Sequence, residues 1–241
     1  MTASPSSALQ LPHVWRVDEL GREGDCIPTG HPELDACLPG GGWPEGHLVE
    51  LLQARAEAHV WQLALPALSA VVRRKSGPVV LVGAPAQPFG PSLAAQGLAP
   101  ERLLWVRAEK PAALLWSAEQ ALRCAEVAAM LAWLPQARNP ELRRLHLAAH
   151  QQQRLLFVIR KPQARTEASP ARLRLLLDGV DEMQVHILKR RGPPLDLPLV
   201  LPARPARLEA LLQARRHKPQ VPAGTENRRS HVLDRPLAIT G

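Results

Sequence analysis

The sequence of 241 residues is poor in aromatic residues and cysteine, and it has no long apolar run. It contains no Tyr, two Phe and six Trp, so its hydrophobic core has to be built mainly from Leu, Val and Ala. The three cysteines show no CxxC spacing, which argues against a disulfide framework and against a zinc site. No stretch approaches the roughly 20 apolar residues of a membrane helix. The first ten residues lack the pattern of a secretory signal, so we expect a reduced cytoplasmic protein.

The net charge of +8 is distributed unevenly along the chain. Residues 1–140 carry 11 basic and 13 acidic groups, a net charge of −2, whereas residues 141–241 carry 19 basic and 9 acidic groups, a net charge of +10. Such asymmetry fits an anionic partner for the C-terminal part, and nucleic acid is the leading candidate. A solvated basic surface with no dedicated ligand is the alternative.

Short apolar runs alternate with amphipathic stretches, which predicts an α/β fold with a mostly parallel sheet flanked by helices. The runs expected to form strands are 47–52, 78–82, 102–106, 127–134 and 155–159, and the expected helices are 54–75, 91–96, 111–124 and 141–153. Pro66 lies inside the first of these helices and predicts a kink or a break. Residues 172–178 and 183–191 alternate like antiparallel strands joined by a turn around Gly179, and such strands are common at one edge of a parallel sheet.

Three regions follow from these patterns. Residues 1–24 form an N-terminal arm that is partly disordered. Residues 25–195 form the core. Residues 196–241 form a tail rich in Pro and Arg with one short helix at 206–216, and we expect the tail to be disordered from residue 217 on.

Residues 27–52 carry IPTG, LD, a Gly-rich loop and GHLVE, an order that resembles the start of the ATP-binding core of the RecA recombinase. Residues 79–104 follow the RecA strand–helix–strand spacing, and EQAL at 119–122 fits as well. From about residue 13 to 195 the chain most resembles the ImuA family, RecA- and SulA-related proteins of bacterial inducible-mutagenesis cassettes. The further motifs that resemble this family are VWR at 14–16, LAWLP at 131–135 and LLFVIR at 155–160. The resemblance implies a RecA-like sheet.

A RecA-type ATPase has a phosphate-binding loop directly after the strand that residues 47–52 represent here. That loop needs two glycines to wrap the phosphates, a lysine to reach them and a Ser or Thr to hold magnesium. In this sequence Gln53 and Ala58 replace the glycines, His59 replaces the lysine and Val60 replaces the hydroxyl residue. Each charge-assisted bond lost in this way forfeits roughly 1.5–3 kcal/mol. We therefore expect a degenerate loop and a pseudo-ATPase.

The acidic residues of such an ATPase are missing as well. Pro85 stands where the carboxylate that activates water belongs, and residues 127–140 contain no Asp or Glu for magnesium. With the general-base and metal roles vacant, we expect no enzyme activity and no cofactor. His146 and His150 have the i, i+4 spacing of a metal site but lack the adjoining Glu of an HExxH motif, so two surface histidines are the simpler interpretation.

Basic residues gather after the strand 155–159, around the predicted antiparallel strands and in the tail. In RecA-like folds the first of these regions faces the DNA axis of the filament, so the resemblance implies contact with DNA phosphates or with a DNA-bound partner. The candidates are Arg160, Lys161, Arg165, Arg172, Arg174, Lys189, Arg190, Arg191, Arg215, Arg216, Lys218, Arg228 and Arg229. No aromatic residue is interleaved in residues 160–191, so stacking on single-stranded bases is not supported.

Trp15 lies in a charged N-terminal segment and is the candidate anchor for a protein partner. The tryptophans expected in the core or at a domain seam are Trp43, Trp105, Trp116 and Trp133.

The ImuA resemblance implies a non-catalytic accessory protein of DNA-damage-induced (SOS) translesion synthesis. The partners that it implies are the RecA recombinase, a Y-family polymerase homologue and an error-prone replicative-type polymerase, with DNA as a further candidate. The alternative is a SulA-type cell-division inhibitor that blocks polymerisation of the tubulin-like division protein, a kinship at the level of fold alone. A third interpretation, an active RecA-type ATPase with an unusual loop, is opposed by the four replacements.

Overall fold

The computed structural model describes residues 26–55, 59–180, 182–193, 195–204 and 210. The described residues up to Arg204 belong to one unit. The N-terminal arm predicted at 1–24 and the disordered tail predicted beyond 217 lie outside the described residues, and so does nearly all of the short helix predicted at 206–216. No helix within the described ranges has the length and apolar character to cross a membrane.

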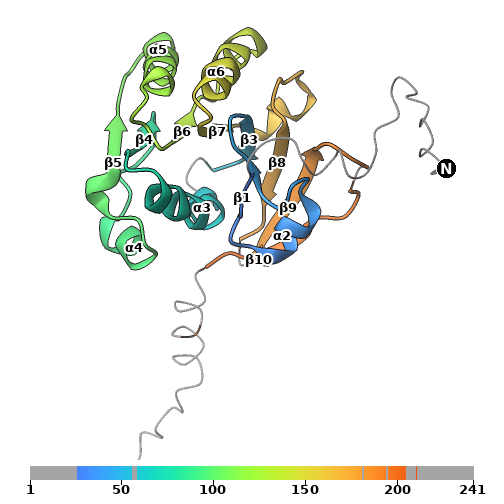
Figure 1. Ribbon diagram of the computed structural model, residues 1–241. Helices are drawn as coiled ribbons and strands as arrows, with labels where there is room; N and C mark the ends of the chain where they lie inside the picture. Colours follow the sequence, from blue (N-terminus) through green and yellow to red (C-terminus); the bar gives the residue numbers. More distant parts are fainter. Residues whose placement is uncertain (1–25, 56–58, 181, 194, 205–209, 211–241) are drawn as a thin grey trace, which may run out of the picture. The chain divides into compact units, whose positions relative to one another are not determined.

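An eight-stranded sheet forms the centre of the fold (Figure 1). In spatial order its strands are β10 (Leu199–Pro202), β9 (Glu182–Lys189), β8 (Leu173–Asp178), β3 (Leu48–Gln53), β7 (Leu155–Arg160), β6 (Ala129–Trp133), β4 (Val79–Val82) and β5 (Leu103–Val106). The six strands from β8 to β5 run parallel to one another. Strand β9 runs antiparallel to β8, and β10 runs antiparallel to β9. The predicted α/β class, with a mostly parallel sheet and antiparallel strands at one edge, is confirmed.

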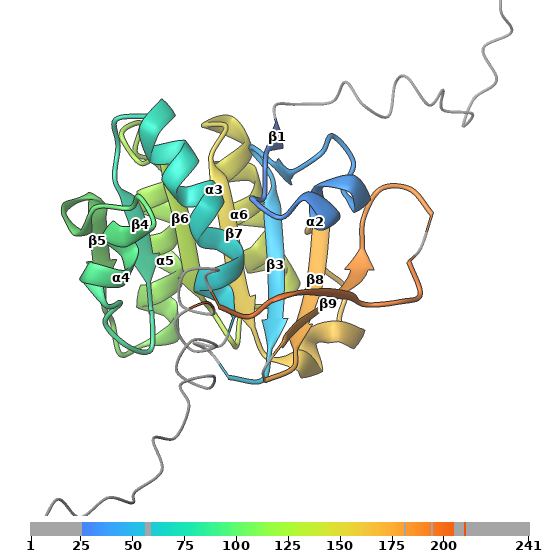
Figure 2. The same ribbon diagram turned by 90° about the horizontal axis from the view of Figure 1, so that it is seen from below.

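Helices cover both faces of the sheet (Figures 1 and 2). Helices α3 (Val60–Arg74) and α4 (Gly90–Ala95) lie on one face, and α5 (Pro111–Arg123) and α6 (Asn139–Gln151) lie on the other. The smaller elements are β1 (Cys26–Ile27), α2 (Pro32–Cys37), β2 (Trp43–Pro44), η1 (Pro100–Arg102) and η2 (Pro162–Thr166). Because successive strand residues point to opposite faces, Val79 and Leu81 join the core under α3, whereas Val80 and Val82 join the core under α5 and α6. Burial on both faces explains the continuous apolar runs of the sequence.

The sheet extends beyond residue 195, where the sequence analysis ended the core. Strand β10 pairs antiparallel with β9, and its Leu201 is almost fully buried. The strand is four residues long and includes Pro202, which an edge strand tolerates because one side of its backbone needs no partner. So short a run next to prolines carries no clear strand pattern, and this is why the sequence placed it in the tail.

Helix α3 runs through Pro66 as one continuous helix, so of the two predicted effects, a kink or a break, the break does not occur. Proline has no N–H to donate to the carbonyl four residues earlier, here that of Gln62. The Nε2 atom of His31 lies 3.3 Å from this carbonyl and supplies a donor from outside the helix. The Pro66 ring packs against Gly30, at which a Cβ would come within 2.3 Å of the proline Cβ. The IPTG segment thus fits against the proline of α3.

Candidate functional site

The connection between β3 and α3 lies where RecA-type ATPases hold the phosphates of the nucleotide. Gln53 ends β3 with only 2% of its surface exposed, and Val60 begins α3 fully buried in the core. Ala58 belongs to residues 56–58, which lie outside the described residues. The residue at the position of the magnesium-binding hydroxyl is therefore an apolar side chain that faces the core.

His59, at the position of the lysine, is bound to the protein itself. Its backbone is left-handed, with φ at +57°. Its Nε2 atom lies 2.8 Å from the carbonyl oxygen of Gly179, and since a carbonyl only accepts, Nε2 is the donor. The imidazole thereby ties the β3–α3 connection to the turn between β8 and β9. A lysine of the phosphate loop would instead extend its charge into the loop.

A cavity of about 210 Å³ opens between these two connections. Its volume is below the roughly 300–1,000 Å³ that is usual for small-molecule sites. The cavity wall carries the carboxylate of Asp178, and Arg55 is the permanently charged cation among its lining residues. A triphosphate needs several cationic or N–H donors, so size and charge both weigh against one here.

The segments that should carry the remaining catalytic acids hold none. Pro85 follows β4, where the resemblance places the carboxylate that activates water. Residues 134–138, which connect β6 to α6, read LPQAR and contain no acid. Within the described ranges, no group of three or more His, Cys, Asp or Glu side chains is arranged to hold a metal ion.

Two of the predicted DNA-contacting arginines are buried. Arg160 and Arg174 are 4% and 7% exposed, and they flank the fully buried Glu50 on the strand between them. Arg160 Nη1 lies 2.8 Å from one carboxylate oxygen of Glu50, and Arg174 Nε lies 2.6 Å from the other. Arg174 also donates to the backbone carbonyls of the η2 crossover, at Ala164 and Glu167. Their burial gives both guanidinium groups a structural role, which is to hold the crossover against the sheet.

Glu167 completes this network from the surface. Its Oε2 atom lies 2.7 Å from Arg160 Nη2, and its side chain is 54% exposed. The hydrogen bond and the charge of Arg160 lower the pKa of Glu167, whereas burial acts weakly in the opposite direction. The carboxylate therefore stays ionised and pairs with Arg160 from a position that is itself largely exposed.

The other six basic candidates of the described core remain accessible at least in part. Lys161, Arg165 and Lys189 are exposed, whereas Arg172, Arg190 and Arg191 are half-buried. The latter three line a small hollow beside the Gly-rich loop at 38–44, and Arg190 donates to the carbonyl of Cys37. Because the N–H of Arg172 bonds the carbonyl of Leu48 at the start of β3, this hollow lies at the amino end of the parallel strands. The His59 cavity lies at their carboxyl end, so the two sites are at opposite edges of the sheet.

His146 and His150, expected as two surface histidines, belong to a cluster of three, in which His150 is exposed. His47 joins them, with ring centroids 5.3 Å from His146 and 5.4 Å from His150. His146 is half-buried, and its Nδ1 atom accepts a hydrogen bond of 3.2 Å from the N–H of Leu48. Burial lowers the pKa of His146, and the nearby charges of His150, Arg172 and Lys189 lower it further. Sequence reasoning missed this cluster because His47 is about a hundred residues away from the other two.

The described tryptophans divide between core and surface. Trp43 and Trp133 are buried as predicted, and Trp43 packs edge-on against Phe157 with ring centroids 5.1 Å apart. Trp105 is half-buried. Trp116 is 64% exposed on α5, so its expected core position is wrong. The remaining predicted site residues, all outside the described residues, are Trp15, Arg215, Arg216, Lys218, Arg228 and Arg229.

No protein-family model matches the chain. The chain is similar to Protein ImuA of two strains of Caulobacter vibrioides, with 36% identity over 129 residues in each case. The aligned part covers 51% of this chain and 52% of the relative, so the chain spans about half the length of the curated relatives it matches. This similarity confirms the family resemblance and makes the chain a homologue of Protein ImuA over about half of its length.

Proposed function

We propose that the chain is a non-catalytic accessory protein of DNA-damage-induced translesion synthesis, and that it acts by binding partners. The observation that carries this proposal is that the protein's own side chains occupy the phosphate-loop position. There the His59 imidazole is bound to the Gly179 carbonyl and Val60 is buried in the core, in a chain homologous to ImuA.

The packing of the core supports the proposal. Buried apolar side chains fill both faces of the sheet, and the ionic network around Glu50 joins β3 to β7 and β8. A domain of this kind acts through its outer surface, and its function depends on the partners that this surface binds.

The partners that we propose are the RecA recombinase, the Y-family polymerase homologue and the error-prone replicative-type polymerase of a mutagenesis cassette. DNA is a further proposed partner, bound through phosphates by the accessible cations. Lys161 and Arg165 on the crossover form one such set, and Arg172, Arg190 and Arg191 at the amino edge of the sheet form another.

Calorimetry with ATP and magnesium tests the non-catalytic part of the proposal. We expect no binding up to about 1 mM ATP, because neither a lysine nor a hydroxyl faces the loop. The double variant His59→Lys/Val60→Thr should not bind ATP either, since the glycines and the acids stay absent. Tight, magnesium-dependent binding by the natural sequence would refute the pseudo-ATPase.

A pull-down with purified RecA and the two polymerases tests the partners. The full chain should retain at least one of the three, whereas the tubulin-like division protein should polymerise normally in its presence. A truncated chain should end at Arg204 and not at residue 192, because β10 belongs to the sheet. Failure to retain any of the three, together with inhibition of the division protein, would favour the SulA-type alternative.

A further inference from the structure

The hollow at the amino end of the parallel strands is lined by charges of one sign. The charged residues of its lining, Arg172, Arg190 and Arg191, are all basic. Arg190 is held by the carbonyls of Cys37 and Pro193, which accept its hydrogen bonds without cancelling its charge. The hollow has a volume of about 20 Å³, far below that of a small-molecule site, so it is a shallow cationic surface and not a pocket.

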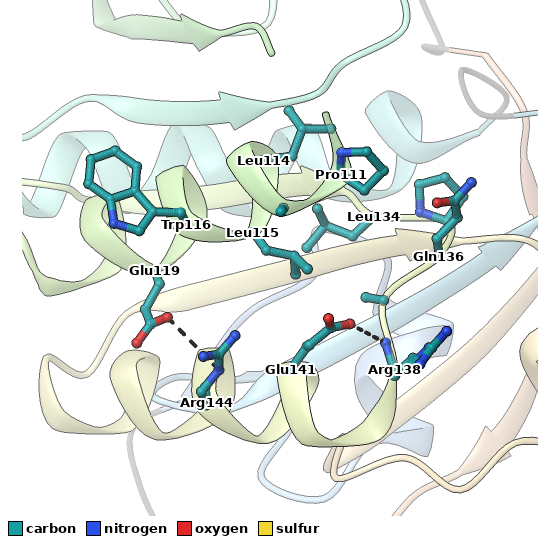
Figure 3. Close-up of a pocket in the computed structure, with 13 residues that line it drawn as sticks. Pro111, Leu114, Leu115, Trp116, Glu119, Leu134, Gln136, Arg138, Glu141 and Arg144 are labelled. Carbon is teal, nitrogen blue, oxygen red and sulfur yellow. Dashed lines mark hydrogen bonds and ion pairs between the residues drawn. The ribbon is translucent and has the colours of Figure 1, made fainter. Parts of the chain in front are cut away.

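The groove of about 500 Å³ between α5 and α6 shows the contrast (Figure 3). Its lining sets Glu119 and Glu141 against Arg138 and Arg144, so its charge favours neither an anionic nor a cationic partner. We therefore expect the amino end of the strands, and not this groove, to attract an anion.

Three histidines continue the cationic surface towards α6. The Nδ1 atom of His146 accepts from the N–H of Leu48, and the N–H of Arg172 donates to the carbonyl of the same leucine. The rings of His47, His146 and His150 lie together, with centroids 5.3–6.5 Å apart. His150 is exposed and the other two are half-buried. An extended anion bound at Arg172 therefore lies next to the histidines.

The charges that act on His146 are positive. Burial is the largest cause of its lowered pKa, and the charges of His150, Arg172 and Lys189 lower this pKa further. These cations come from α6 itself, from the segment before β8 and from β9. A bound anion would offset the positive charge that opposes protonation of His146.

The acids of the elements packed against α6 are paired with cations or lie beside one. The pairs are Glu45 with Lys75, Glu50 with Arg160 and Arg174, and Glu119 with Arg123. Glu126, in the loop that leads to β6, is exposed, and Arg154 donates to the carbonyl of Ala125 next to it. These acids therefore leave the positive charge around the histidines largely in place.

We propose that the histidine cluster and the neighbouring cations form one surface that binds the phosphate backbone of duplex DNA, and that protonation of the histidines strengthens this binding. The residues of this amino-edge surface are His47, His146, His150, Arg172, Lys189 and Arg191. The inference rests on the proposed function in its choice of DNA, and it deepens that function by naming histidines as DNA contacts and pH as a regulator.

The shape and chemistry of the amino-edge surface favour duplex DNA. The hollow is too small to seat the bulky apolar side chain that anchors a typical protein partner. Arginine binds phosphate oxygens in a bidentate manner, and interfaces with DNA are richer in positive charge than those between proteins. The surface contains no Trp, Tyr or Phe on which single-stranded bases could stack.

Binding of DNA and of protons should be coupled at this surface. Because phosphates offset the surrounding cations, the pKa of His146 should be higher in the complex than in the free protein. The complex then takes up protons, and the affinity increases as the pH falls through the range between the two pKa values.

Fluorescence anisotropy with a fluorescein-labelled duplex at constant ionic strength tests the coupling. The full chain should bind at least about fivefold more tightly at about pH 5.5 than at pH 7.5, since one added phosphate contact at about 0.1 M salt is worth up to roughly eightfold. His146→Asn/His150→Gln should lose most of this increase, and the Asn side chain keeps an acceptor for the Leu48 N–H. The single variant His150→Gln changes an exposed side chain and should lose part of it. Circular dichroism at each pH verifies that the proteins are folded.

Matched variants separate the amino-edge surface from the rest of the chain. His186→Gln changes a half-buried histidine of β9 that lies opposite Leu176, towards the carboxyl end of β8, and should keep the full increase. Lys189→Gln/Arg191→Gln should weaken DNA binding by about tenfold or more at both pH values, because two phosphate contacts are lost. Arg73→Gln/Arg74→Gln on α3 should leave the affinity unchanged.

Three results would overturn the inference. An equal pH dependence in the natural chain and in His146→Asn/His150→Gln would remove the histidines from the DNA contact, while DNA could remain a partner of the chain. Displacement of the duplex by poly-glutamate at equal concentration of charge would make this a surface for acidic proteins. Absence of DNA binding at both pH values would remove DNA from the proposed partners as well. In each case the binding of RecA and the polymerases is tested separately by the pull-down.

Discussion

Glu50 is a fully buried carboxylate that compensates two buried guanidinium groups from the neighbouring strands. Glu50→Gln keeps the shape of the side chain but removes its charge, which takes the ion-pair partner from the buried Arg174 and leaves Arg160 with the exposed Glu167 alone. Breaking such a buried pair typically costs about 3–5 kcal/mol. We expect a loss of this size in the free energy of unfolding, measured by urea denaturation.

Glu167→Gln is the matched control, because it makes the same substitution on the exposed side of Arg160. Exposed ion pairs contribute little, so the cost should stay below about 1 kcal/mol. Equal losses for the two variants would contradict a special role for the buried carboxylate.

His146 makes the stability of the protein depend on pH. Because its pKa is lowered in the folded state, chiefly by burial, the unfolded chain takes up a proton more readily as the pH falls. The contribution of the neutral imidazole is full above the unfolded pKa of about 6.5 and is lost as the pH falls below it towards the folded pKa. We expect the free energy of unfolding to decrease between about pH 7 and pH 5.5.

His146→Asn separates this titration from other groups. The Asn Oδ1 atom can accept from the Leu48 N–H as Nδ1 does, but the side chain does not ionise. The decrease between neutral and mildly acidic pH should therefore be smaller in the variant. Parallel curves for the two proteins would remove His146 as the cause.

At the scale of elements, helix α3 and the loop before α2 are coupled through one carbonyl group. The side chain of His31 supplies the donor that Pro66 denies to the Gln62 carbonyl. His31→Ala should cost about 1 kcal/mol or somewhat more in the natural sequence, because that partly buried acceptor loses its donor. In a Pro66→Ala background the restored helical N–H can take its place, so the cost should be smaller by about 1 kcal/mol. A double-mutant cycle of urea denaturation measures this coupling, and additive effects would disprove it.

Strand β10 provides a test within one element, because its side chains alternate between core and solvent. Leu201 is almost fully buried, whereas Val200 is 55% exposed. Leu201→Ala should cost about 2–5 kcal/mol of unfolding free energy, and Val200→Ala should stay within about 0.5 kcal/mol. Thermal and urea denaturation of the two variants check this, and two small effects would mean that β10 adds little to the sheet.

How far the sequence predicts an element depends on how local its signal is. Strand β4 lies within the range expected for it and β7 exceeds its expected range by one residue, Arg160, because burial on both faces leaves a continuous apolar run. The phosphate-loop position was also predictable, since it follows its strand directly. The Glu50–Arg160 and Glu50–Arg174 pairs span 110 and 124 residues, and the contact of His47 with His146 is similarly distant. Such contacts exist only once parallel strands are placed side by side, so the sequence showed Arg160 and Arg174 simply as part of a basic run.

At the scale of the whole molecule, the positive charge is shared between the described core and the part of the chain beyond it. Residues 141–204 carry 12 basic and 6 acidic groups, a net charge of +6, and residues 205–241 carry 7 basic and 3 acidic groups, a net charge of +4. Two of the 12 basic groups in the core, Arg160 and Arg174, are buried and internally paired. The count of charged residues therefore overstates the positive charge that the core can offer to an anionic partner. The share of the positive charge that residues 205–241 contribute is correspondingly larger.

The salt dependence of DNA affinity measures how much the core and residues 205–241 each contribute to DNA binding. For each phosphate that a protein neutralises on duplex DNA, the slope of log affinity against log salt concentration becomes steeper by about 0.9. We expect the chain ending at Arg204 to bind a fluorescein-labelled duplex with a shallower slope than the full chain, but not with a slope of zero. Lys161→Gln/Arg165→Gln should make it shallower again, by up to about 2 units, because both side chains are exposed. Arg73→Gln/Arg74→Gln on α3 is the matched control and should leave the slope unchanged.

An identical slope for the full and the shortened chain would place the whole DNA contact on the core. Absence of DNA binding at low salt would mean that the basic surface serves protein partners.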